Sequence, residues 1–178
     1  LRKAEDLNQH YDGIVLPGGE STVQGKLMKE LGMFDIIKSQ IKNDMPVLAT
    51  CAGMILLADK LEADSKVHLQ TIPMTVKRNA YGRQLGSFHT NATIKGIGEV
   101  PMTFIRAPYV SQVSDEVEIL SVVEERIVAV RYQKQIALAF HHLYDTSLEI
   151  IILFPIMRVT IQQNRSSSHI FPSELLGN

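Results

Sequence analysis

The chain has a single cysteine, and it stands where an apolar run gives way to small residues, in the order Thr50-Cys51-Ala52-Gly53. A nucleophile on a sharp turn between a strand and a helix forms a nucleophile elbow. Small neighbours allow the tight turn, and the backbone N–H of Ala52 would face a developing oxyanion. The start of the following helix favours a thiolate, so we expect a lowered pKa for Cys51. The alternative is a core cysteine without chemistry, because Cys is among the most buried residue types.

A second segment that could bind a substrate is the glycine loop Pro17-Gly18-Gly19-Glu20-Ser21-Thr22. Glycines let backbone N–H groups approach a ligand closely, and the start of a helix favours negative charge. An ordinary turn between strand and helix could have the same sequence. The loop and Cys51 are more specific together, because both would leave the carboxyl ends of parallel strands, where open α/β sheets bind their ligands.

The first half of the chain contains the elements that must position these loops. Apolar runs at 12–17 and 45–50 predict buried strands, and 52–58, apolar on every side, predicts a buried helix. Between them the pattern predicts an amphipathic helix over 21–42, with Ser21 or Thr22 as its cap and Gly32 as a place where it can break. Its apolar positions recur every three or four residues, at Val23, Leu27, Leu31, Phe34, Ile37 and Ile41.

The second half changes to short runs rich in β-branched residues, which predict strands. These runs cover 74–76, 86–94, 103–107, 117–123, 126–132 and 135–140. Gln133 and Lys134 would form a tight hairpin, and His141 would follow its second strand. Strands alternating with helices and then strands alone predict an α/β sandwich. We expect one domain over 1–163 and a polar tail over 164–178.

Composition excludes several classes of protein. The 178 residues, 45% of them hydrophobic, can bury one substantial core. A net charge of −1 with interspersed signs gives no basic stripe for nucleic acid or a membrane surface. A lone cysteine excludes an internal disulfide, and no Cys and His cluster suggests a metal site, so we expect a cytoplasmic protein without metal. No apolar run approaches the roughly 20 residues that a membrane span requires.

Five separated segments resemble the glutaminase subunits of pyridoxal 5′-phosphate synthase, which are class I glutamine amidotransferases. They are Gly13-Ile-Val-Leu-Pro-Gly-Gly-Glu-Ser-Thr22, Thr50-Cys-Ala-Gly-Met-Ile-Leu-Leu-Ala58, Val76-Lys-Arg-Asn-Ala-Tyr-Gly-Arg-Gln84, Phe104-Ile-Arg-Ala-Pro108 and Ala139-Phe-His141. Their order and approximate spacing also fit, from Asp12 to His141. The glycine loop and the Arg78-Asn79 pair distinguish these subunits from other class I amidotransferases.

The resemblance implies a flavodoxin-like three-layer sandwich, with a mostly parallel central sheet and additional antiparallel strands in the second half. It also implies that Cys51 attacks the carboxamide of L-glutamine, forms a glutamyl thioester and releases ammonia, after which water frees glutamate. His141 matches the histidine that takes the thiol proton and later activates water.

The resemblance further implies the substrate contacts. They fall on Gly19, Glu20, Ser21, Arg78, Ile105 and Arg106, with oxyanion contacts on Gly18, Gly19 and Ala52. A guanidinium offers a fork of donors to the α-carboxylate of glutamine, so that role suits Arg78 or Arg106. No cofactor is implied. The implied partner is a (β/α)₈-barrel synthase subunit that receives the ammonia within a hetero-oligomer.

The sequence departs from the family at three places. Family members continue His-Pro-Glu, with the glutamate orienting the histidine, whereas this chain reads His141-His142-Leu143. Asp145 and Glu149 are candidate substitutes for that acid. A strand and a helix that open the family's sequences have no counterpart before Leu1, and 149–163 does not align. These departures indicate a chain truncated at its amino terminus and diverged at its carboxyl terminus, or an unusual fragment, with weak or absent activity.

Two other functions therefore stay open. One is a catalytically impaired homologue that only binds its partner or glutamine. The other is a cysteine enzyme of similar topology from a peptidase-like or chaperone-like branch, against which the glycine loop and Arg78 argue.

If activity is limited only by the missing acid, Leu143→Glu should raise the rate of ammonia release from glutamine. Loss of the orienting acid costs about 10⁴ in rate in a serine protease, and less where a thiolate is already populated. An unchanged rate would assign the weak activity to the divergent termini instead.

Overall fold

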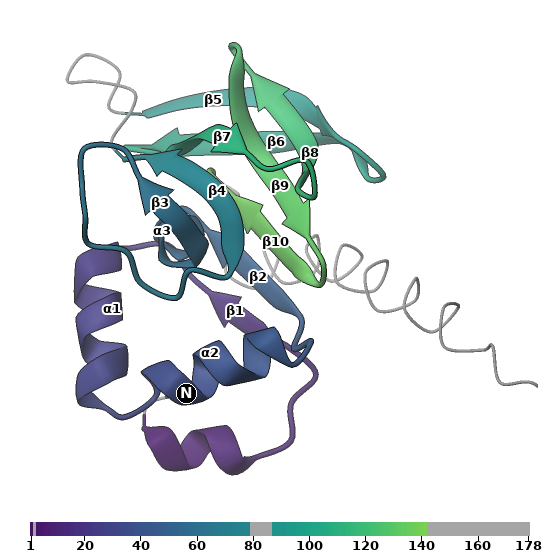
Figure 1. Cartoon of the computed structure of the whole chain (residues 1–178). Coiled ribbons are helices and arrows are strands. Elements are labelled where there is room, and N and C mark those ends of the chain that lie inside the picture. The colour runs from purple at the N-terminus through teal and green to yellow at the C-terminus, as the bar shows by residue number, and fades with distance from the viewer. Residues whose placement is uncertain (2, 79–86, 142–178) are drawn as a thin grey trace, which may run out of the picture.

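The structure is a computed structural model that describes residues 1, 3–78 and 87–141 (Figure 1). A 3₁₀ helix, η1 (Ala4–Asn8), precedes the first strand. The α-helices are α1 (Ser21–Glu30), α2 (Phe34–Lys42) and α3 (Ala52–Leu57). The strands are β1 (Ile14–Leu16), β2 (Val47–Thr50), β3 (Ala58–Leu61), β4 (Ile72–Lys77), β5 (Ser87–Ile94), β6 (Gly98–Ile105), β7 (Tyr109–Val113), β8 (Glu118–Val123), β9 (Arg126–Tyr132) and β10 (Gln135–Leu138).

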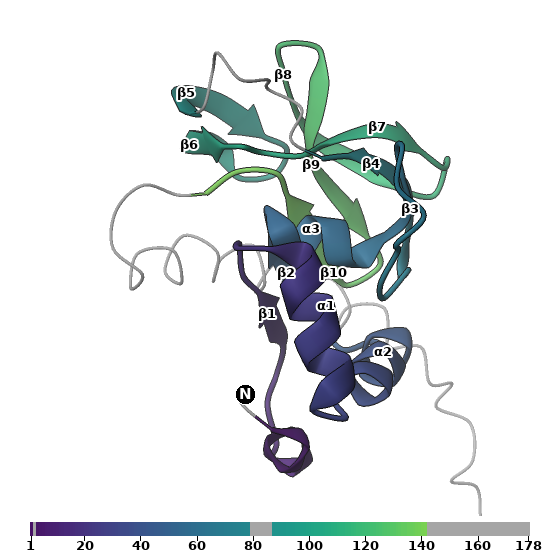
Figure 2. The same ribbon diagram turned by 90° about the vertical axis from the view of Figure 1, so that its left-hand side faces the viewer.

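The main sheet is mixed, in the order β1-β2-β10-β9-β7-β4-β3, with β8 on β9. Strands β1, β2 and β10 run parallel, as do β3 and β4, while β4, β7, β8, β9 and β10 make the antiparallel pairs. Strands β5 and β6 form a separate hairpin. Helix α3 packs on β1, β2 and β10, and α1 packs against α3 (Figure 2). The expected α/β class and the antiparallel strands of the second half are confirmed.

The predicted helix over 21–42 is two helices. Gly32 stands between them at φ +67°, a backbone conformation that favours glycine, so the expected break is confirmed. The predicted cap was wrong: Glu20 is the N-cap of α1, and its carboxylate accepts a hydrogen bond from Val23 N at 2.8 Å. Ser21 is the first helical residue instead, and its buried hydroxyl has no partner among the described residues.

The apolar stripe of α1 is not its buried face. Val23, Leu27 and Leu31 are exposed, whereas Ser21 and Gly25 are the buried residues of this helix. Gly25 lies so close to His68 that a Cβ there would be 2.1 Å from the ring. The helix therefore approaches the rest of the fold through small residues. In α2 the prediction holds, because Ile37 and Ile41 are buried.

The sequence patterns did not predict two of the strands. Strand β3 follows α3 directly and contains Asp59 and Lys60, so it has no apolar run to signal it. It exists because it pairs with β4. Strand β7 has the polar residues Ser111 and Gln112 at its centre, and it is held between β4 and β9.

The described part of the chain shares one hydrophobic cluster, to which α3 contributes all of its large apolar side chains. The predicted domain boundary at residue 163 and the tail lie outside the described residues, as do Leu143, Asp145 and Glu149. In the part of the chain that the structure describes, none of the helices has the length and apolar character to cross a membrane.

Helix α3 reaches β1 only because residue 53 is glycine. A Cβ on Gly53 would lie 2.2 Å from the backbone oxygen of Leu16. We expect Gly53→Ala to lower the free energy of unfolding by about 2–4 kcal/mol, because backbone cannot yield cheaply to the added atom. Urea unfolding measures this loss.

The control is Gly96→Ala, in a turn at φ +81° with nothing within 4 Å of the added Cβ. It should cost only about 1 kcal/mol of backbone strain. Equal losses for the two variants would contradict the packing argument.

Candidate active site

Cys51 adopts a strained backbone conformation, with φ 48° and ψ −102°, between β2 and α3. Such conformations cost of order 1–3 kcal/mol in non-glycine residues and cluster at functional sites. The N–H of Cys51 donates to Leu138 O at 2.8 Å, and its carbonyl accepts from Ile55 N at 3.4 Å. The turn is thus fixed by β10 on one side and by the first turn of α3 on the other, as expected of a nucleophile elbow.

The side chain of Cys51 is nearly enclosed, since the residue is only 8% exposed. Burial raises the pKa of its thiol, although a hydrogen bond from the backbone of Ala52 acts in the opposite direction. The expected lowering of this pKa was therefore wrong. Helix α3 has only six residues, and the backbone N–H that it offers does not offset the desolvation of the thiolate.

His141 lies just beyond β10, the strand that pairs with β2, so it shares an edge of the sheet with Cys51. Its N–H donates to Thr103 O at 2.7 Å, and its carbonyl accepts from Thr103 N at 2.8 Å. A Cβ on Gly18 would lie 2.1 Å from the Cε1 of His141, so the imidazole rests on the glycine loop. The glycine loop and His141 therefore lie side by side.

Thr103 was missed by the sequence reasoning, which treated it only as a strand residue. It is buried, and its hydroxyl lies 3.0 Å from the Nδ1 of His89. Next to it, Phe104 contacts Phe140 at 5.7 Å between ring centroids. These contacts fix the backbone that holds His141, and no local pattern signals them because they join β5, β6 and the end of β10.

The glycine loop is held from behind by Gln24 of α1. The Nε2 of Gln24 donates to Gly18 O at 2.9 Å and to Pro17 O at 3.2 Å. Gly19 stands at φ +126°, which a residue with a side chain rarely adopts. No role was assigned to Gln24 from the sequence either. The one pattern that could have indicated its role is the position of a glutamine in the first turn of the helix that follows the glycine loop.

Arg78 immediately follows β4 and reaches across to the glycine loop. Its Nη2 lies 3.0 Å from Glu20 Oε1, and its Nη1 lies 3.0 Å from Asp64 Oδ2. A hydrogen bond from Val23 N is the largest cause that lowers the pKa of Glu20, and the charge of Arg78 adds to it. Glu20 and Arg78 were predicted to share a site, whereas Asp64, within a polar stretch, gave no signal.

Ile105 and Arg106 lie at the end of β6, just beyond the residue that pairs with His141. Arg106 stands at φ +45°, so this turn is strained as well. Among the described residues, the ion pairs of Arg78 are with Glu20 and Asp64, and Arg106 takes part in neither of them.

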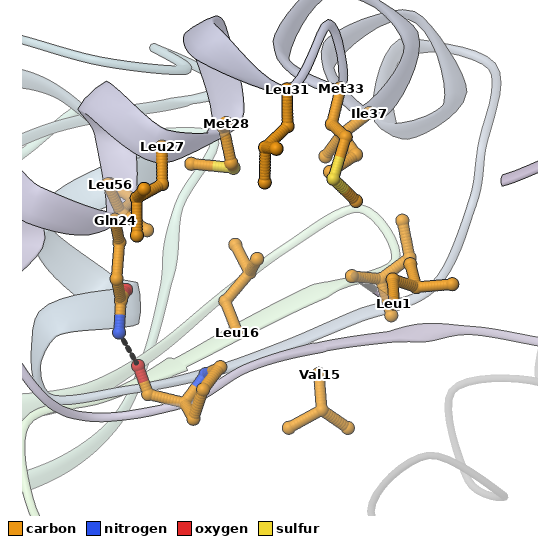
Figure 3. Close-up of a pocket in the computed structure, with 12 residues that line it drawn as sticks. Leu1, Val15, Leu16, Gln24, Leu27, Met28, Leu31, Met33, Ile37 and Leu56 are labelled. Carbon is orange, nitrogen blue, oxygen red and sulfur yellow. Dashed lines mark hydrogen bonds between the residues drawn. The ribbon is translucent and has the colours of Figure 1, made fainter. Parts of the chain in front are cut away.

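A cavity of about 500 Å³ lies between α1, α2 and β1 (Figure 3). It is lined by Leu1, Ile14, Val15, Leu16, Pro17, Gln24, Leu27, Met28, Leu31, Met33, Ile37 and Leu56. Gln24 is the only polar side chain among these lining residues, and it is committed to the loop carbonyls. This cavity therefore lacks the charged partners that the head of an α-amino acid needs.

Within residues 1, 3–78 and 87–141, no group of three or more His, Cys, Asp or Glu side chains could hold a metal ion.

Comparison with known proteins matches residues 1–157 to the SNO glutamine amidotransferase family. One relative, named pyridoxal 5′-phosphate synthase subunit PdxT, from Desulfitobacterium hafniense (strain DSM 10664 / DCB-2), is 56% identical over 141 residues, which are 79% of this chain and 71% of the relative. A relative of the same name from Haemophilus influenzae (strain PittEE) is 48% identical over 144 residues, 79% of this chain and 75% of the relative.

Solved structures agree with these matches. One described as a crystal structure of glutamine amidotransferase superimposes with a TM-score of 0.79 at 32% identity, covering 91% of this chain and 83% of that one. A glutamine amidotransferase structure from Thermotoga maritima, with a TM-score of 0.52 at 12% identity over 87% of this chain and 66% of that one, shares the fold.

The raised pKa of Cys51 predicts how the rate of its alkylation depends on pH. Iodoacetamide reacts with the thiolate, and burial keeps the thiol protonated to higher pH than an exposed thiol. We expect the rate in the folded chain to rise with a midpoint above that of glutathione. Mass spectrometry of this single cysteine gives the rate directly.

The same chain in urea is the control, and there the midpoint should return to about 8.5. A midpoint in the folded chain below that of glutathione would contradict the prediction.

Proposed function

The chain belongs to the SNO glutamine amidotransferase family, and we propose that it hydrolyses L-glutamine to glutamate and ammonia through a thioester on Cys51. The observation that carries this proposal is the strained elbow of Cys51, whose backbone is tied to the strand that leads to His141. The imidazole of His141 in turn rests on Gly18 of the glycine loop. The segments that carry nucleophile, base and loop follow neighbouring parallel strands and so lie at the same edge of the sheet, which supports the proposal.

In the first step the sulfur of Cys51 attacks the carboxamide carbon of glutamine, and His141 takes the thiol proton. The oxyanion that forms would accept hydrogen bonds from the backbone N–H groups of Ala52 and of the loop at Gly18 and Gly19. His141 then gives its proton to the leaving nitrogen, and ammonia departs. In the second step His141 activates water, which hydrolyses the thioester and frees glutamate.

The buried thiol constrains this mechanism. Burial raises the pKa of Cys51 and so disfavours a preformed thiolate, and transfer of the thiol proton to His141 is therefore proposed to accompany attack. The base at His141 is then more important than in an enzyme whose thiolate is already formed. The rate then depends directly on the orientation of this imidazole. Leu143 stands where the family has the glutamate that orients it, so this replacement should lower the rate.

The charged head of glutamine has partners on the other side of the loop. The guanidinium of Arg78 is proposed to bind the α-carboxylate, and the carboxylate of Glu20 the α-ammonium group. In the described state these two side chains pair with each other at 3.0 Å. Ser21 follows Glu20 at the start of α1, and Ile105 with Arg106 completes the proposed set of substrate contacts.

The relatives are named as subunits of pyridoxal 5′-phosphate synthase, and this chain is proposed to have the same assembly. Its partner would be a (β/α)₈-barrel subunit that uses the ammonia, in a hetero-oligomer in the cytoplasm. The reaction uses only side chains, backbone N–H groups and water. The identity with these relatives favours the enzyme over the binding-only homologue, for which the replacement of the family's glutamate by Leu143 and the divergent termini argue.

The test is ammonia release from L-glutamine by the purified full chain, with and without a pyridoxal 5′-phosphate synthase subunit, and with Cys51→Ala as the blank. We expect release above the blank, and more of it with the partner present. Circular dichroism must first show that both chains are folded. Release that survives Cys51→Ala would refute the nucleophile, and no release with the partner present would refute the proposed function.

A further inference from the structure

We infer that Asp64 is a positioning residue, which holds the guanidinium of Arg78 in the orientation that receives the α-carboxylate of glutamine. The inference rests on the proposed function, because it deepens the role of Arg78 in substrate binding. Its evidence is the set of contacts around Arg78, which involve three separate segments of the chain.

The fold brings Asp64 and Arg78 to the same edge of the sheet. Asp64 follows β3 and Arg78 follows β4, and these strands run parallel with Leu61 opposite Val76. A backbone hydrogen bond of 2.9 Å from Glu62 N to Val76 O continues the pairing beyond β3. The position of Asp64 relative to Arg78 is therefore set by the sheet.

The carboxylate of Asp64 is also fixed by an interaction that does not involve Arg78. Its Oδ1 accepts a hydrogen bond from Lys66 N at 2.9 Å, while its Oδ2 lies 3.0 Å from Arg78 Nη1. These two interactions use different oxygens, so they do not compete. The bond from Lys66 N is the largest cause that lowers the pKa of Asp64, and Arg78 lowers it further, so the group is a carboxylate at neutral pH.

Asp64 and Glu20 hold different nitrogens of the same guanidinium, one from the β3 side and one from the start of α1. An arginine has five N–H donors in a fixed fork, so donors remain for a ligand. Two anchors define the plane of the fork and remove the freedom of a long side chain.

The two carboxylates differ in what they can do next. The Glu20 side chain is 51% exposed, while Asp64 is 28% and Arg78 26% exposed. The Oε1 of Glu20 can exchange Arg78 for the α-ammonium group of a substrate while its Oε2 keeps the hydrogen bond from Val23 N. Asp64, the more shielded carboxylate, keeps its hold on Arg78 while that exchange takes place.

The experiment measures binding, so it does not depend on turnover. The Cys51→Ala full chain is titrated with L-glutamine by calorimetry, alone and with Asp64→Asn added. Asp64→Asn keeps the shape of the side chain and removes its charge, and we expect the Kd to rise on the order of 3- to 10-fold. An unchanged Kd overturns the inference.

The matched control is Glu62→Gln, two residues away on the same loop. Glu62 pairs with Lys77 at 3.4 Å and does not contact Arg78 in the described structure. Its loss should leave the Kd for glutamine unchanged. A rise as large as that of Asp64→Asn would show that any lost charge on this loop weakens binding, and would overturn the inference.

A positioning role has a signature that a structural role lacks. In an Arg78→Gln background, Asp64→Asn should have no further effect on the Kd, because Asp64 acts through the guanidinium. The preference for L-glutamine over its α-carboxamide should also fall in Asp64→Asn. A further loss in the Arg78→Gln background, or equal losses for both ligands, overturns the inference.

Ammonia release separates this result from the proposed function. If the chain with Cys51 intact releases no ammonia but the Cys51→Ala chain binds glutamine in an Asp64-dependent way, the proposed function fails and the inference stands. If release is observed and binding does not depend on Asp64, the inference alone fails.

Discussion

The backbone of Cys51 is held at φ 48° and ψ −102°, and most of the site is arranged by the contacts that keep it there. Strain of this kind persists only where the surroundings over-determine it. Here the N–H of Cys51 is held by Leu138 O, so the elbow depends on the pairing of β2 with β10. On the other side, α3 can begin at once because Gly53 allows the helix to lie on the carbonyl of Leu16. Strand, turn and helix are fixed by each other.

The glycine loop contacts both the proposed base, His141, and the proposed partner of the charged head of the substrate, Arg78. At Gly18 it touches the imidazole of His141, and two residues later Glu20 pairs with Arg78. Gln24 fixes the loop carbonyls from α1, and Glu20 also caps that helix. A small rotation of α1 would therefore move the groups facing the carboxamide and the groups facing the charged head together. The loop sets the distance between the reacting and the recognised ends of a substrate.

The sequence predicts well those elements that local patterns determine. Buried strands at β1 and β2, the all-apolar α3 and the break at Gly32 follow from period and composition, and so does the position of His141 after a hairpin. The failures have a common cause, which is dependence on distant neighbours. Strand β3 is polar and is defined by its pairing with β4, while Asp64 and Thr103 matter through partners far along the chain.

Two expectations at the site were wrong, namely the cap of α1 and the pKa of Cys51. Each followed a general preference of residue types, and in each a specific interaction in this structure is stronger than that preference. Serine and threonine are the common caps, yet Glu20 precedes both and its longer side chain reaches Val23 N. A helix start favours a thiolate, yet enclosure of Cys51 by the core disfavours it more. Neither competition can be judged without knowing the solvent exposure of the groups involved.

The place of β10 in the sheet also has a consequence for folding during synthesis. Strand β10 is the last strand along the described chain, yet it inserts between β2 and β9. A ribosome would therefore release Cys51, the glycine loop and both long helices well before the strand that fixes the elbow becomes available. Pairing at such long sequence separation is slow, because the loop must close before the contact is gained. The elbow of Cys51 would therefore form only when β10 pairs with β2. An incompletely synthesised chain would contain Cys51 but would not hold it in the conformation of the elbow.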